Sequence, residues 1–161
     1  MRKGNFDSGY EQEIFKKLQR AKVDVKYEPR SFKYSRRTSK VFCRDCGSNR
    51  IAKSASYTPD FRIGRSIYLE SKGYFKPSNR ARMEDFIKDR PDVDLRFIFG
   101  SDNWLTAKKI SRYSDWAEKN KVKYAIDEIP ASWLKDARKE LASEPDTDRG
   151  EPLQAVRDPA K

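Results

Sequence analysis

Residues 95–99, with the sequence Leu-Arg-Phe-Ile-Phe, form an almost continuous apolar run. A strand that is covered on both faces has this pattern, whereas a strand with one face in water alternates apolar and polar residues. Residues 78–90 before the run and residues 130–142 after it carry apolar side chains at helical spacing. A strand buried between amphipathic helices predicts an α/β fold, with a mixed sheet flanked by helices.

The same periodicities place the other elements. Helices are expected over residues 10–21, 78–90, 114–120 and 130–142, and strands over residues 23–28, 67–72, 95–99 and 122–126. Asp7 or Ser8 can cap the first helix and Ser78 the second, and Leu141 belongs to the apolar stripe of the last. We expect one folded domain over residues 1–142 and a disordered tail over residues 143–161, which has prolines and acids but no aromatic residue.

The chain is strongly basic, with 36 Lys and Arg against 25 Asp and Glu and a net charge of +11. Neutralising phosphates releases counterions, so this excess favours a nucleic-acid partner. A membrane surface is the weaker alternative, because no apolar run approaches a spanning length and no basic amphipathic helix stands apart from the core. Residues 1–10 are polar and lack the apolar region of a signal peptide, so a cytoplasmic location is expected.

Residues 32–56 interrupt the regular pattern with seven cationic side chains and a single acid, Asp45. This segment is expected to form an extended arm or hairpin rather than part of the core. The candidate DNA contacts on the arm, and after the strand over residues 67–72, are Arg36, Arg37, Lys40, Arg44, Lys76, Arg80 and Arg82. For each of the last three, a position on a solvated helix face is the alternative.

The chain contains no histidine, and this absence excludes whole classes of active site. A Ser-His-Asp triad, a histidine general base and a histidine metal ligand are all impossible. Metal chemistry must therefore use carboxylates, which favour Mg²⁺ or Mn²⁺, or the two cysteines, which favour Zn²⁺.

Asp60 and the segment Glu70-Ser71-Lys72 are the candidate catalytic residues. Side chains alternate along a strand, so Glu70 and Lys72 share one face. A turn around Gly64 can bring Asp60 beside Glu70, where the two carboxylates would repel unless a divalent cation lay between them. Lys72 could orient an attacking water or stabilise charge on a phosphate. A solvated strand edge with a cross-strand salt bridge is the alternative.

Glu11 is unusual because it lies on the apolar stripe of the first helix, one turn before Ile14 and Phe15. A carboxylate on a buried face needs a partner. Glu11 can be a capping glutamate in the first helical turn or a functional carboxylate.

These residues resemble the signature of the PD-(D/E)xK nucleases, and further blocks resemble the phage endonuclease I family, the Holliday-junction-resolving enzymes of podophages. The blocks are Phe6-Asp7-Ser8-Gly9-Tyr10-Glu11, Tyr27-Glu28, Tyr57-Thr58-Pro59-Asp60-Phe61, Glu70-Ser71-Lys72-Gly73, Asp94-Leu95-Arg96-Phe97-Ile98-Phe99 and Ile129-Pro130-Ala131-Ser132-Trp133. The resemblance implies a restriction-endonuclease-like fold in an intertwined homodimer, in which each protomer lends a strand to the other through a bridge.

The resemblance also implies roles for single residues. Asp60 and Glu70 would be metal ligands, assisted by the backbone carbonyl of Ser71, and Lys72 would be the catalytic lysine. Glu11 would be a further carboxylate and metal ligand that reaches this composite site from the partner protomer, which favours the functional role for it. The family has one more glutamate on the first strand; Lys26 takes its place here, and Glu28 on the same face could substitute.

Cys43 and Cys46 lie in the middle of the arm and are followed by Gly47. A C-x-x-C pair is half of a tetrahedral zinc site, and this chain has no other cysteine or histidine to complete it. In the implied dimer the arm bridges the protomers, where a twofold axis could bring two pairs together around one structural Zn²⁺. A disulfide, disfavoured in a reducing cytosol, and two idle thiols are the alternatives.

The residues predict a metal-dependent endonuclease that hydrolyses phosphodiesters in DNA. The family resemblance further implies that its substrate is branched DNA, four-way junctions included, and that it acts in the cytoplasm of an infected bacterial host. Two alternatives are a PD-(D/E)xK nuclease of another specificity and a non-catalytic, zinc-stabilised DNA-binding module. A cleavage assay on plasmid and junction DNA, with Mg²⁺ or with a chelator, separates them.

Overall fold

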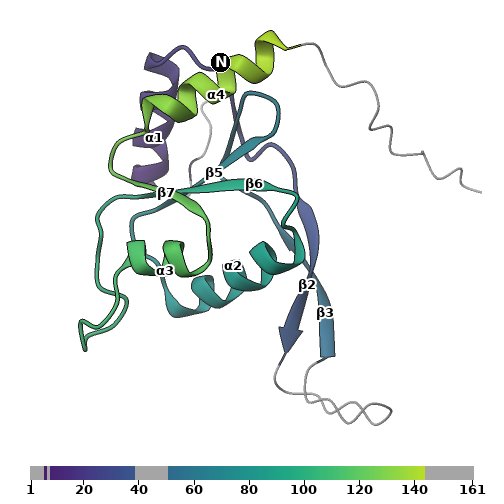
Figure 1. Ribbon diagram of the computed structural model, residues 1–161, viewed down its shortest axis with the longest axis vertical. Helices are drawn as coiled ribbons and strands as arrows, with labels where there is room; N and C mark the ends of the chain where they lie inside the picture. The colour runs from purple at the N-terminus through teal and green to yellow at the C-terminus, as the bar shows by residue number, and fades with distance from the viewer. Residues whose placement is uncertain (1–5, 7, 39–50, 144–161) are drawn as a thin grey trace, which may run out of the picture.

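The computed structural model describes residue 6, residues 8–38 and residues 51–143 (Figure 1). Five strands form the main sheet, in the spatial order β1 Val25–Tyr27, β4 Phe61–Ile63, β5 Ile67–Lys72, β6 Asp94–Phe99 and β7 Lys123–Ile126. The helices are α1 Gly9–Arg20, α2 Pro77–Asp89, α3 Tyr113–Lys119 and α4 Ala131–Ala142. Strands β1, β4 and β5 pair antiparallel, whereas β5, β6 and β7 pair parallel, so the predicted mixed sheet is confirmed.

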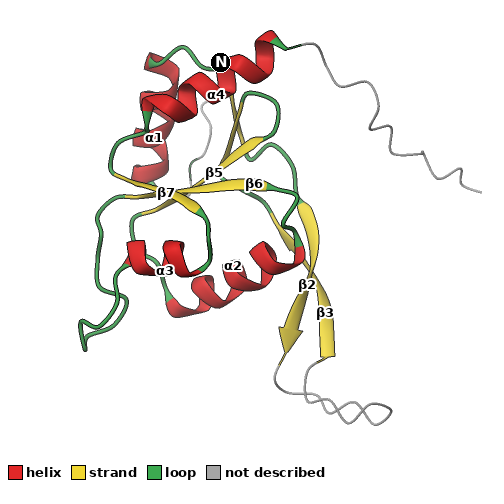
Figure 2. Ribbon diagram, in the orientation of Figure 1, coloured by secondary structure: helices red, strands yellow, loops and turns green. Residues whose placement is uncertain are grey.

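The helices cover both faces of the sheet, with α1 and α4 on one side and α2 and α3 on the other (Figure 2). Ile14 of α1 and Trp133 of α4 pack with Ile98 in one core, while Phe86 of α2 and Trp116 of α3 belong to the other. All of residues 95–99 are buried, as expected of a strand with structure on both faces.

A tight turn through Gly64 joins β4 to β5. Gly64 has a φ of 61°, a left-handed conformation that favours glycine. A Cβ there would lie 2.9 Å from the Ala137 carbonyl oxygen of α4, so the turn also lets α4 pack directly on the sheet. The hairpin expected around this residue is confirmed.

Residues 32–38 and 51–57 form a second, two-stranded sheet, β2 Phe32–Thr38 and β3 Ile51–Tyr57. The two strands are antiparallel and Phe32 pairs with Tyr57, which confirms a hairpin. The expectation that this segment lies outside the core is wrong for the base of the hairpin, where β2 begins and β3 ends. Phe32, Tyr34 and Tyr57 are buried, and all three rings pack against Phe86 of α2. The inner face of the arm therefore belongs to the fold.

Two smaller expectations are also corrected. Ser78 does not cap α2; the helix begins at Pro77, whose missing N–H suits the first turn, and Lys76 precedes it without a side-chain cap. Leu141 does not join the buried stripe of α4; it lies in the last turn of the helix and is exposed. Within the described residues, no helix combines the length and apolar character needed to cross a membrane. Of the expected tail over residues 143–161, all but residue 143 lies outside the described residues, as do both cysteines.

Candidate active site

Strand β5 presents Glu70 and Lys72 on one face, as its alternation predicts. Lys72 Nζ lies 2.5 Å from Glu70 Oε1, and Glu70 is only 2% exposed. Asp60 precedes β4, and its Oδ2 accepts hydrogen bonds from the amide and the hydroxyl of Ser71 at 2.7 and 2.8 Å. The sheet therefore brings the two carboxylates and the lysine together.

Electrostatics at this group are unbalanced, because two carboxylates share one lysine. Burial and the nearby charge of Glu70 raise the pKa of Asp60 from 3.8 to about 7, although Lys72 and the Ser71 hydrogen bonds oppose the shift. Burial acts to lower the pKa of Lys72, but Glu70 and Asp60 outweigh it, so the pKa of Lys72 is raised. The site holds more negative charge than its own lysine neutralises.

Glu11 lies in the first turn of α1 and is buried. Its carboxylate accepts hydrogen bonds from the Ser8 hydroxyl and the Tyr27 hydroxyl, each at 3.1 Å, and its amide donates to Ser8 Oγ. Glu11 also faces Lys72 across a cleft of about 200 Å³ and contributes to the raised pKa of that lysine. Ser8 is therefore the cap of α1, and Glu11, bonded to it in the first turn, borders the site within a single chain.

Tyr57 is a neighbour of the site to which sequence reasoning assigned no role. Its hydroxyl donates a short hydrogen bond to Glu70 Oε2, and its ring is buried under the guanidinium of Arg82 at 5.6 Å. Burial and the charge of Glu70 raise the pKa of Tyr57 well above 10, so the phenol stays protonated and remains a donor. Its place three residues before Asp60 was the one available signal, because the contact with Glu70 depends on the arm packing on α2.

The donor set suits a hard divalent cation. Within the described residues, no three acidic or cysteine side chains lie close enough together to hold a metal by themselves. Mg²⁺, however, usually keeps several waters and takes only one or two carboxylates. Asp60 Oδ1 accepts no hydrogen bond within the described part of the chain, and Asp60 carries the raised pKa that a cation would relieve. Two oxygen ligands with surplus negative charge thus fit Mg²⁺ or Mn²⁺.

The two residues considered for the missing family glutamate lie on the surface, on β1 and just after it. Lys26 and Glu28 are both exposed. Glu28 has a φ of 42°, and its amide donates to the Asp60 carbonyl oxygen at 2.8 Å. Glu28 therefore supports the backbone at Asp60 with its main chain.

The candidate DNA contacts fall into different environments. Arg36 lies 3.9 Å from Asp85, and Lys76 is exposed before α2. Arg80 donates to the carbonyl oxygens of Phe75 and Leu105, so it connects two segments of the protein. Arg82 lies over Tyr57. The side chain of Arg37, and Lys40 and Arg44, lie outside the described residues, as do Cys43 and Cys46.

Comparison with known proteins gives consistent matches. A family model described as phage endonuclease I matches residues 1–149. Endonuclease I of Escherichia phage T7 is 29% identical over 139 residues, which cover 86% of this chain and 84% of the relative. Endodeoxyribonuclease 1 of Enterobacteria phage T3 is 30% identical over 86 residues, or 53% of this chain and 57% of the relative.

Proposed function

Because the chain belongs to the phage endonuclease I family and is an endodeoxyribonuclease, we propose that it cuts branched DNA, four-way junctions in particular, with Mg²⁺ or Mn²⁺. The reaction would be phosphodiester hydrolysis that leaves a 5′-phosphate. The observation that carries the proposal is the pair of carboxylates, Asp60 and Glu70, that share the single lysine Lys72.

Each residue of the group has a distinct task. Asp60 and Glu70, with the Ser71 carbonyl, would hold the cation, which supplies Lewis-acid activation of the phosphate and of a bound water. Tyr57 and Ser71 orient the two carboxylates by hydrogen bonds. Lys72 neutralises negative charge as it grows on the phosphate oxygens in the transition state. Glu11 borders the same cleft and can accept the proton of the attacking water.

The test of this function is a cleavage assay on supercoiled plasmid, a synthetic four-way junction and a linear duplex of the same arm sequence. We expect Mg²⁺-dependent cuts in the junction, none with a chelator and much slower cleavage of the duplex. Equal rates on junction and duplex would favour a nuclease of another specificity. The non-catalytic DNA-binding module is disfavoured, because the family consists of endonucleases.

The proposal extends to a homodimer with exchanged segments. In the structure, the β2–β3 hairpin lets α1 and β1 pack on the sheet of their own chain. If two copies exchanged the part before β3, the same contacts would form between chains at little cost, as in domain swapping. Glu11 would then reach Lys72 of the other protomer.

Mixing a Glu11→Ala protein with a Lys72→Ala protein tests this exchange. In an exchanged heterodimer, one site carries both defects and the other carries none, so activity should return. In a dimer with self-contained sites, every site keeps one defect. No recovery of cleavage after proven subunit exchange would contradict the exchanged arrangement.

A further inference from the structure

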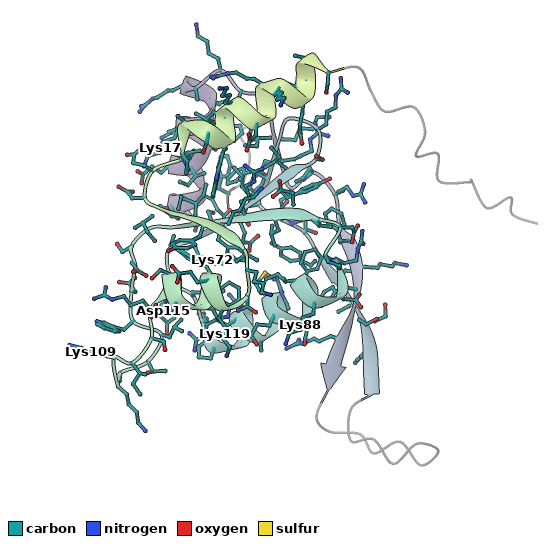
Figure 3. All side chains as sticks on the ribbon, viewed as in Figure 1. Lys17, Lys72, Lys88, Lys109, Asp115 and Lys119 are labelled. Carbon is teal, nitrogen blue, oxygen red and sulfur yellow. The ribbon has the colours of Figure 1, made fainter. Side chains whose placement is uncertain are left out.

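Residues 103–112 form a projection between β6 and α3, which we call the finger. Trp104 and Arg112 form an isolated antiparallel bridge at its base, and the Leu105 amide donates to the Ser111 carbonyl oxygen at 2.8 Å. At its tip, the Lys109 amide donates to the Thr106 carbonyl oxygen at 3.0 Å. Figure 3 shows Lys109 at the outer end of this segment, away from the body of the molecule.

The base of the finger is fixed to the fold. Arg80 donates to the Leu105 carbonyl oxygen at 3.4 Å, and the Phe75 amide donates to the Tyr113 hydroxyl at 2.9 Å. Arg112 donates to the Asp102 carbonyl oxygen and lies 4.1 Å above the Trp104 ring. The finger therefore presents its tip in a defined direction.

The finger starts at the sheet edge that carries the candidate active site. Strands β5 and β6 are parallel, and Lys72 pairs with Phe99, so both strands end at the same edge. The Gly100 amide donates to the Lys72 carbonyl oxygen at 3.0 Å, just before the finger begins. Tyr74, 69% exposed, follows Lys72 on the connection that contacts the base of the finger. DNA bound at Lys72 would therefore pass close to the finger.

The finger combines unpaired positive charge with exposed apolar surface. Residues 104–112 contain three cations and no acid. Lys108 and Lys109 form no ion pair within the described residues, whereas Lys17, for example, lies near three acids. Ile110 is 75% exposed and Trp104 is 39% exposed. Protein–protein interfaces are depleted in lysine, but minor-groove proteins flank an apolar wedge with cations.

We propose that the finger is a second DNA-contacting element beside the active site, in which Lys108 and Lys109 contact phosphates and Ile110 enters a groove or an opened base step. This inference rests on the proposed nuclease function. It assigns the finger to the DNA arm next to the scissile phosphate. In a branched substrate, base steps next to the crossover are the easiest to open, so the wedge would favour such DNA.

The tryptophans offer a direct test. Of the three, Trp116 and Trp133 are only 4% and 6% exposed, so Trp104 dominates quenching by acrylamide. In chelator, a four-way junction should shield Trp104 from acrylamide, and a Trp104→Phe variant should lose this signal. Binding of labelled junction, followed by anisotropy, without shielding would overturn the proposal. Shielding of Trp104 that increases with protein concentration in the absence of DNA would also overturn the proposal, because the finger would then contact another protein molecule.

A charge variant gives the second test. Lys108→Ala with Lys109→Ala should reduce the slope of log Kd against log salt by about 2, since each lost phosphate contact removes about 0.9. The control is the double variant Lys135→Ala, Lys139→Ala, which removes the same charge from two exposed side chains of α4, a helix on the other face of the sheet from α2 and α3. The slope of log Kd against log salt for this control should equal that of the unchanged protein. Equal slopes for both variants would overturn the proposal. Absence of Mg²⁺-dependent junction cleavage by the unmodified protein would instead count against the nuclease function.

Discussion

Two charged clusters lie on neighbouring strands of the same sheet. On β6, Arg96 is 3% exposed and donates to both carboxylate oxygens of Asp94 at 3.0 and 2.6 Å and to Asp136 at 2.9 Å. Lys123 adds a second cation, 3.5 Å from Asp94. In the second cluster, Glu70 and Lys72 lie on β5, and Asp60, which precedes β4, shares Lys72 with Glu70. The first cluster holds equal numbers of cations and acids, and the second has one acid too many.

This difference is visible in the protonation of the acids. Burial acts to raise the pKa of Asp94, but its bonds to Arg96 outweigh burial and the pKa falls below 3.8. Burial and Glu70 raise the pKa of Asp60 to about 7. In the balanced cluster each acid is neutralised by a cation of the protein, whereas surplus negative charge in the second cluster favours the binding of a metal cation. The comparison distinguishes a cluster with balanced charges from the candidate active site, whose charges are not balanced.

The largest expected effect is on cleavage. Replacing Glu70 with Gln or Lys72 with Ala should slow Mg²⁺-dependent junction cleavage by at least about 100-fold, because both act on the transition state. Binding of the junction should persist, since it depends on phosphate charge. The matched control is Asp136→Asn in the balanced cluster, which should leave the cleavage rate unchanged. A comparable loss in the control would remove the distinction between the clusters.

The second effect concerns stability and pH in the metal-free protein. The folded-state pKa of Asp60, about 7, exceeds the ordinary value of 3.8, so the folded protein holds the proton more tightly. Stability is therefore fully present below about pH 4, falls as the pH rises from about 4 to about 7, and loses nothing further from this group above the folded-state pKa.

The Asp60→Asn variant isolates this cost. In chelator, it should gain about 2 kcal/mol over the unchanged protein between pH 5 and pH 8, measured by urea unfolding. The same pH change should give no such gain for Asp136→Asn. If the free energy of unfolding of Asp60→Asn and of the unchanged protein varied with pH in the same way, Asp60 would carry no uncompensated charge.

A smaller effect is expected from Tyr57, which orients Glu70 without contacting substrate. Tyr57→Phe keeps the packed ring but removes the hydrogen bond to Glu70 Oε2. The Mg²⁺ concentration for half-maximal cleavage should rise about 10-fold, as for other residues that orient metal ligands. A purely structural role would lower stability but leave the Mg²⁺ dependence unchanged. The control is Tyr34→Phe, because the buried hydroxyl of Tyr34 has no hydrogen-bond partner within the described residues and its removal should leave the Mg²⁺ dependence unchanged.

The smallest effect should come from the balanced cluster itself. Asp136 is half exposed, so Asp136→Asn should lower the free energy of unfolding by no more than about 1 kcal/mol. Differential scanning calorimetry measures this change. A loss of several kcal/mol would mean that the cluster on β6 stabilises the sheet more than a partly hydrated ion pair can.

Local patterns explain what could be predicted from the sequence. The alternation along β5 places Glu70 and Lys72 on one face, and the turn at Gly64 brings Asp60 to them over a short stretch of chain. These relations depend on strand geometry and a tight turn, both of which are encoded locally. The buried run at residues 95–99 likewise predicted β6 correctly.

The missed relations depend on contacts between distant segments. Arg96 meets Asp136 across 40 residues of sequence, and no local pattern announces that pair. The inner face of the arm was missed for another reason. Phe32 and Tyr34 alternate with Lys33 and Ser35, as in a half-buried strand. The segment was predicted to lie outside the core because of its many cationic residues, and this short alternation was given no weight.

The contact between Tyr57 and Glu70 also has a mechanical consequence. Tyr57 is the last residue of β3, its ring packs 4.5 Å from Phe86, and its hydroxyl donates to Glu70 of the candidate active site. The arm cannot swing about its base unless that ring leaves the core or Glu70 moves with it. We therefore expect the base of the arm and Glu70 to move together, so that a displacement of the arm would also displace Glu70. Amide hydrogen exchange at residues 54–57 as slow as in β5 is the signature of this stiffness.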